Sequence, residues 1–169
     1  MAKMEFNSAE DALKRAMLLE MNGKEFFEMA ARTASSPVAK ELFEHMVEEE
    51  KHHLHILQIT FKRYLESGQI EMPSEAERDF AFDDPIIGKD FLVELKNSHF
   101  DSSAISIALN LEEKAFKFYE KAEKEATDPE IKKLFRWLTE WEIGHHKKLL
   151  TLEEEFRQEV WNDSNFWPM

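Results

Sequence analysis

The sequence predicts an all-α protein, a four-helix bundle made of two repeated helical hairpins that are joined by a long crossover. Helix-favouring residues are plentiful in the 169-residue chain, which has only four Gly and five Pro. A shift of the numbering by 92 residues carries Glu50 onto Glu142 and His53 onto His145. A fixed offset of this kind indicates an internal duplication, so each half should fold as one hairpin.

The first hairpin is expected to consist of helices at about residues 8–34 and 37–66. Ser8, followed three residues later by an acidic residue, forms a capping pattern at the start of the first helix. Pro37, which follows a serine, marks the start of the second helix. Apolar residues recur at helical spacing through both ranges, and Gly68 ends the pattern. Because the connection between the two helices is very short, they should lie antiparallel.

Residues 67–101 interrupt the helical pattern and form the predicted crossover, with one short helical candidate at 88–96. The second hairpin follows with helices at about 102–126 and 129–160, and its second helix again begins at a proline. Residues 161–169 form an aromatic tail, which we expect to pack on the bundle or on a second subunit.

Composition and charge exclude several classes of function. The net charge of −13 would repel the phosphates of nucleic acid, whereas it suits a protein that binds cations. The chain has no Cys, which excludes disulfides, thiolate metal sites and iron–sulfur modules within it. No apolar run approaches the roughly 20 residues of a membrane span, and the first residues lack the apolar core of a signal peptide. We therefore expect one cytoplasmic domain over residues 1–169.

A carboxylate lies near the middle of each of the four apolar stripes. At about 100° per residue, Glu50 and His53 are about 60° apart on one helix face, which they share with Phe43 and Leu57. The second copy repeats this arrangement, and each half adds one earlier inward Glu. Buried carboxylates are costly unless they are paired or bind a metal ion. The predicted ligands of a two-metal site are Glu20, Glu50, His53, Glu112, Glu142 and His145.

A metal-free bundle is the alternative to this interpretation. Glu-x-x-His pairs arise by chance in helices rich in Glu, and Phe or Met at helical spacing is ordinary core. Two features favour the two-metal site. The two pairs lie in register within the repeat, and the lone Glu of each half also points inward.

Other polar residues are expected to have lesser roles. Tyr119, two turns from Glu112, can hydrogen-bond a ligand carboxylate, with ordinary packing of a satisfied hydroxyl as the alternative. His146 is expected to support the site from outside or to pack, rather than to act as a seventh ligand. Surface positions are predicted for His45, His52, His55 and Glu113, and also for Glu49, whose alternative is to flank the site.

The chain resembles the rubrerythrin-type branch of the ferritin-like superfamily over about residues 8–160. The resemblance rests on the spacing Glu20…Glu50-x-x-His53…Glu112…Glu142-x-x-His145 and on Phe116-Lys-Phe-Tyr119 after the third glutamate. It implies a ferritin-like four-helix bundle that holds two iron ions and often forms homodimers. The roles it implies are bridging or chelating for Glu50 and Glu142, terminal carboxylates for Glu20 and Glu112, and one ion each for His53 and His145.

The resemblance further implies a non-haem diiron-carboxylate oxidoreductase that reduces hydrogen peroxide or dioxygen, an activity linked to oxidative stress. Full-length rubrerythrins carry a Cys-rich rubredoxin domain, which is absent here, so the electron donor is expected to be a separate protein, rubredoxin-like or other. They also carry an additional helix-three glutamate, one turn from the usual ligand, where this chain has Ala115.

Three alternatives stay open at this point. The first is a ferroxidase or other iron-handling protein that uses the same ligands. The second is a site that holds Mn or Zn in place of iron, because affinity alone does not select iron. The third is a non-catalytic helical interaction module, with the acidic surface and the aromatic tail as its binding features.

Overall fold

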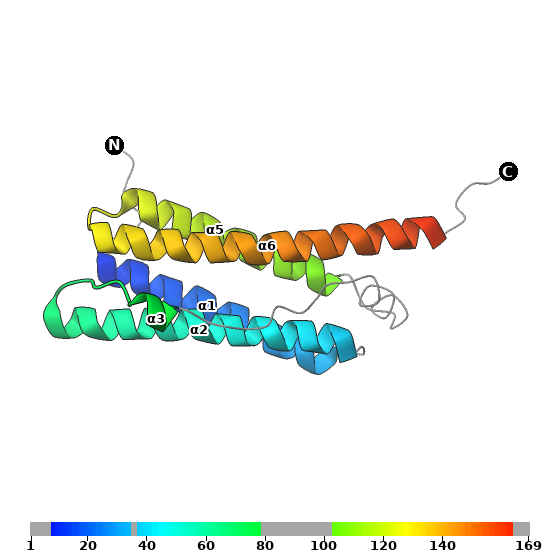
Figure 1. Cartoon of the computed structure of the whole chain (residues 1–169), viewed down its shortest axis with the longest axis horizontal. Helices are drawn as coiled ribbons and strands as arrows, with labels where there is room; N and C mark the ends of the chain where they lie inside the picture. Colours follow the sequence, from blue (N-terminus) through cyan, green and yellow to red (C-terminus); the bar gives the residue numbers. More distant parts are fainter. Residues whose placement is uncertain (1–7, 35–36, 79–102, 164–169) are drawn as a thin grey trace.

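Two antiparallel helical hairpins make up the protein. The computed structural model describes residues 8–34, 37–78 and 103–163. The four long helices are α1 (Ala9–Thr33), α2 (Pro37–Ser67), α5 (Ser103–Glu125) and α6 (Pro129–Asp163). α1 pairs with α2, α5 pairs with α6, and α1 also contacts α5, so the hairpins pack as one bundle (Figure 1). The described residues contain no β-strand, and the arrangement confirms the predicted all-α, ferritin-like fold.

The helix starts are those that the sequence signals predict. The Ser8 hydroxyl accepts a hydrogen bond from the Asp11 N–H at 3.1 Å, and the Asp128 carboxylate accepts one from the Glu130 N–H at 2.8 Å. Gly68, with a φ of 70°, follows the end of α2 in the left-handed conformation that favours glycine. α6 continues three residues beyond its expected end at 160, and residues 164–169 of the predicted tail lie outside the described residues.

The crossover joins the end of α2, at one end of the bundle, to the start of α5, at the other (Figure 1). Its described part contains a short helix, α3 (Glu75–Arg78), which the sequence analysis did not predict. Ser74 and Glu77 cap this helix reciprocally through two hydrogen bonds of 2.9 and 3.3 Å. Arg63 of α2 binds Glu77 at 2.7 Å and so fixes α3 on the bundle. The helical candidate at 88–96 lies outside the described residues.

The hydrophobic core is divided into two clusters. One contains Phe27, Phe43 and Leu149, and the other contains Leu13 and Phe135 among other residues. Polar residues on each helix separate the two clusters, since every long helix has a buried glutamate near its middle. The sequence thus places a layer of charged residues between two apolar layers, and this charged layer contains the predicted metal ligands.

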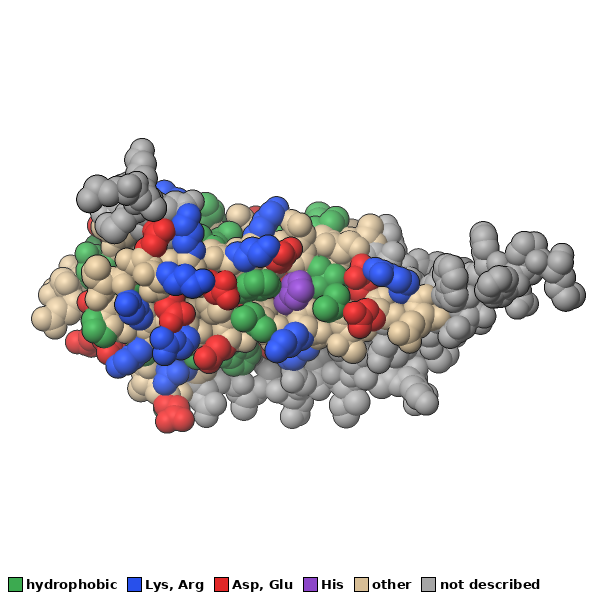
Figure 2. All heavy atoms as spheres, turned by 90° about the horizontal axis from the view of Figure 1, so that it is seen from above, with side chains coloured by type: hydrophobic (Ala, Val, Ile, Leu, Met, Phe, Trp, Pro, Cys, Tyr) green, Lys and Arg blue, Asp and Glu red, His purple; other side chains and the backbone are tan. Residues whose placement is uncertain are grey.

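The described residues on the outer surface of α5 and α6 carry charges of both signs. Basic and acidic side chains alternate across it (Figure 2). Several pair along or between the helices, as in Arg136 with Glu123 at 2.7 Å and Lys117 with Glu113. This pattern is typical of a solvated helix face.

Candidate metal centre

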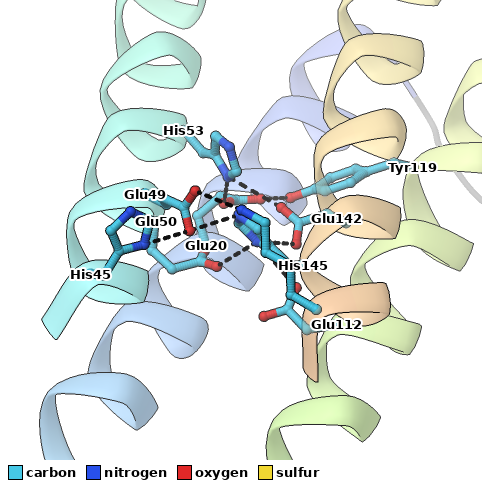
Figure 3. A network of polar contacts seen from close by, with 10 residues as sticks. Glu20, His45, Glu49, Glu50, His53, Glu112, Tyr119, Glu142 and His145 are labelled. Carbon is cyan, nitrogen blue, oxygen red and sulfur yellow. Dashed lines mark hydrogen bonds and ion pairs between the residues drawn. The ribbon is translucent and has the colours of Figure 1, made fainter. Parts of the chain in front are cut away.

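The structure brings together all six residues that the sequence predicts as metal ligands (Figure 3). Each is at most 3 % exposed. They come from the middle of all four long helices, with one glutamate on α1 and one on α5, and a Glu-x-x-His pair on α2 and on α6. The six are Glu20, Glu50, His53, Glu112, Glu142 and His145.

The six side chains form two overlapping groups. In each group, one nitrogen or carboxylate oxygen from each of four residues lies within 4.8 Å of the others. Glu50 and Glu142 belong to both groups. The first group adds Glu20 and His53, and the second adds Glu112 and His145. This is the geometry of two adjacent cation sites that share two carboxylates.

Both histidines direct their Nδ1 atoms at the carboxylates. His53 Nδ1 lies 3.1 Å from a Glu20 oxygen and 3.2 Å from a Glu142 oxygen. His145 Nδ1 lies 3.5 Å from Glu142 and 3.6 Å from Glu112. The two imidazole rings stack with centroids 5.6 Å apart. The Glu-x-x-His spacing therefore places the same ring atom of each copy in the site.

Burial and the close contacts within the cluster change the pKa values of its glutamates. Burial raises the pKa of Glu50 well above its ordinary value, and the nearby carboxylates of Glu20 and Glu142 raise it further. Burial and Glu142 have the same effect on Glu112. Burial also opposes ionisation of Glu142, but hydrogen bonds from its neighbours, Glu112 first among them, hold its pKa well below the usual range. Without a cation, some of these carboxylates must therefore keep protons.

The histidines compensate part of this negative charge. Burial disfavours their charged forms, but contacts with Glu142 and Glu20 raise the pKa of His53 to about 9. Contacts with Glu112, Glu142 and Glu49 likewise raise the pKa of His145 well above its usual value, against the effect of burial. The folded cluster thus attracts positive charge, whether as protons or as metal ions.

The donor set fits bound metal ions. Among the described residues, His145 Nδ1 and one carboxylate oxygen each of Glu112 and Glu142 are buried without a hydrogen-bond partner. Buried polar atoms of this kind are costly in a folded protein unless they have a ligand. Four carboxylates and two imidazole nitrogens are donors that iron and manganese bind well.

Tyr119 supports the site by a direct contact. Its hydroxyl donates a hydrogen bond to a Glu20 carboxylate oxygen, as the sequence analysis anticipated for a ligand carboxylate. Burial and the charge of Glu20 raise the pKa of Tyr119 well above its ordinary value, so the hydroxyl keeps its proton. Its repeat counterpart, Phe27, is equally buried but has no hydroxyl. The two halves of the site therefore differ.

The predicted surface positions of Glu49 and His45 are wrong. Glu49 is 3 % exposed and His45 is 7 % exposed. Glu49 Oε2 lies 3.1 Å from His145 Nε2 and 3.2 Å from His45 Nδ1. His145 and Lys148 of α6 reach Glu49, so the buried face of α2 is wider than the stripe around Glu50. The sequence signal for this arrangement was the four-residue spacing of His45 and Glu49 on one helix face.

The remaining histidines lie outside the cluster. His52 was predicted at the surface but is half-buried, because α3 folds back on it and its Nε2 donates to the Arg78 carbonyl at 3.1 Å. His55 is exposed, as predicted. Glu113 binds Lys117, as expected for a surface residue. His146 is half-buried, and its ring lies edge-on to that of Phe116 with the centroids 5.5 Å apart. Of the two roles predicted for His146, this contact is the packing one.

A pocket of about 240 Å³ between α1 and α5 reaches the carboxylates. Four site glutamates line it, together with Gly23 and Ala115. These two small residues are repeat counterparts, since 23 and 115 differ by the offset of 92. A larger pocket of about 970 Å³, on the outer side of α1 and α2, includes none of the six residues. The smaller pocket therefore gives a small molecule a route to the site carboxylates.

Comparison with models of protein families matches residues 11–153 to the family described as Rubrerythrin. No curated protein and no solved structure gave a match. Among the described residues, no helix combines the length and the apolar character needed to cross a membrane.

The metal-free protein is expected to lose stability as the pH rises from 6.5 to about 9. The pKa of His53 is raised from 6.5 to about 9 on folding, so its protonation stabilises the fold fully below pH 6.5. That contribution disappears as the pH rises through the folded pKa. Denaturant titrations of the metal-free protein across this range should show the decline in the free energy of unfolding. A bound ion replaces the proton, so metal-loaded protein should decline less. A constant or rising stability of the metal-free protein would contradict the assignment.

Gly23→Ala is expected to weaken metal binding without unfolding the chain. A Cβ at this position would lie 3.1 Å from a Glu50 carboxylate oxygen, so the carboxylate must shift. We expect the affinity for metal to fall about tenfold. Mutation of a residue that supports a metal ligand costs about 10–100-fold in affinity, and this change displaces Glu50 only slightly. Gly144→Ala is the matched control, because no atom lies within 4 Å of the added Cβ. Calorimetric metal titrations of both variants test this. Equal affinities would show that Gly23 does not make room for Glu50.

Proposed function

Because the chain belongs to the rubrerythrin family, we propose that it is a non-haem diiron oxidoreductase that reduces hydrogen peroxide or dioxygen. The observation that carries the proposal is the pair of overlapping buried ligand groups that share Glu50 and Glu142. Two ions held side by side can share the two electrons that cleavage of an O–O bond requires. Manganese or zinc can occupy the same donors, and the redox role assigned here requires iron or manganese.

Each ligand has a distinct position in this proposal. Glu50 and Glu142 would bind both ions, since both belong to each group. Glu20 and His53 would complete one ion site, and Glu112 and His145 the other. When bound, two ferrous ions supply the two electrons that convert hydrogen peroxide and two protons into two water molecules.

The protein groups around the ligands control orientation and access. The Tyr119 hydroxyl holds one Glu20 oxygen and thereby fixes which oxygen faces the neighbouring histidine. The apolar clusters above and below the site keep bulk water away from it. The pocket beside Gly23 and Ala115 has room for a small oxidant and opens onto the shared carboxylates.

Electrons must then come from another molecule. The chain has no Cys and so contains no rubredoxin-type centre. We propose a separate donor protein, rubredoxin-like or other, and a homodimer as the working assembly.

The test is turnover of iron-loaded protein with a chemical reductant. Anaerobically reduced protein is mixed with hydrogen peroxide or with oxygenated buffer, and iron oxidation is followed by absorbance while excess dithionite-reduced methyl viologen supplies electrons. We expect many turnovers, with iron constant at two per chain. The reductant alone, without protein, sets the background rate.

Glu50→Ala and Glu142→Ala should each lower metal affinity by more than about 100-fold, because loss of a mere supporting partner already costs about 10–100-fold. Glu113→Ala removes a carboxylate that binds Lys117 outside the site, and it should leave binding and turnover unchanged. Iron that accumulates beyond two per chain without turnover would favour the iron-handling role. A chain that binds no metal would favour the interaction module.

A further inference from the structure

We propose that Glu49 positions His145 and thereby makes the two ion sites chemically unequal. The proposal rests on the two-metal function above and concerns a residue outside the six ligands. It arises from a comparison of the two repeats at the positions that lie behind each histidine.

Behind His145 lies a carboxylate. His145 turns Nδ1 toward the site, and its opposite nitrogen, Nε2, lies 3.1 Å from Glu49 Oε2. The same Glu49 oxygen lies 3.2 Å from His45 Nδ1, and Lys148 Nζ lies 3.8 Å from the other oxygen. Glu49 thus connects α2 to α6 in a buried row beside the ligands (Figure 3).

Behind His53 lie two indole rings instead. The repeat counterparts of Glu49 and His45 are Trp141 and Trp137, at the same offset of 92. Their ring centroids lie 5.3 and 5.8 Å from that of His53, and both meet it edge-on. Among the described residues, His53 Nε2 is buried and, unlike His145 Nε2, has no carboxylate at ion-pair distance. The polar group of an indole is an N–H donor, so an indole cannot accept a hydrogen bond from an imidazole N–H as a carboxylate does.

The difference has a chemical consequence for metal binding. A carboxylate that faces the outer N–H of a ligand histidine fixes its tautomer and orientation, and it makes the inner nitrogen a stronger donor. Among the described residues, His145 Nε2 has a carboxylate at ion-pair distance and His53 Nε2 does not. The halves also differ at Tyr119, which holds the Glu20 carboxylate but contacts neither histidine ring nitrogen. We expect the stronger donor atom of His145 to make the ion site of Glu112 and His145 bind more tightly than that of Glu20 and His53.

Anaerobic titration with Fe(II), followed by calorimetry, tests this. The wild-type protein should bind two ions in two unequal steps. Glu49→Gln keeps the shape of the side chain but removes its charge, and it should weaken the tighter step by about 10–100-fold while changing the other by less than about threefold. Glu48→Gln is the matched control, because Glu48 precedes Glu49 on α2 and its carboxylate binds the exposed Lys51. It should leave both steps unchanged.

A spectroscopic readout separates positioning from a purely structural role. Mössbauer spectra of the protein loaded with ⁵⁷Fe(II) should show two quadrupole doublets, of which Glu49→Gln shifts one. If the variant does not fold, the wild-type spectrum can still contradict the proposal, because unequal sites cannot give a single doublet. A single doublet from two equivalent ions would overturn the proposal, as would equal weakening of both steps by Glu49→Gln. Normal two-ion binding in that variant would contradict the role of Glu49 but leave the proposed function intact. A wild-type chain that binds no iron would contradict both.

Discussion

Burial of four carboxylates at one level of the bundle is the constraint on which the rest of the structure depends. Each carboxylate lies between apolar residues on its own helix, so folding of the core forces all four together. Burial raises the pKa values of Glu50 and Glu112 well above the ordinary range, and repulsion from the neighbouring carboxylates raises them further. Such a cluster is tolerated only with compensating positive charge, which protons and histidines supply in the metal-free protein and which metal ions would supply more completely.

The duplicated fold holds this cluster without making its halves identical. The repeat preserves the six donors and places the same histidine nitrogen in the site from both hairpins. It does not preserve what lies around them: Tyr119 has Phe27 as its counterpart, and Glu49 has Trp141. The shared donors permit two ions, and the differing neighbours give each ion its own surroundings. A duplicated site can thus acquire unequal halves without losing any ligand.

Much of this arrangement could be predicted from the sequence because it depends on distances along one helix. The inward direction of Glu50 and His53 follows from their three-residue separation and from their apolar neighbours. The burial of Glu49 and His45 could not be predicted in the same way, because it depends on contacts with residues far along the chain, such as that of Glu49 with His145. Likewise α3 is too short to give a periodic signal, and it changes the surroundings of His52.

The central claim, that the buried cluster is a two-metal site, is tested most directly by the metal content of tag-free protein purified without oxygen. Elemental analysis should find close to two iron ions per chain, or a mixture of iron and manganese with the same total. A chain that contains no metal, and that takes up none when Fe(II) is added, would contradict the account. Its four buried carboxylates would then be held by protons and histidines alone.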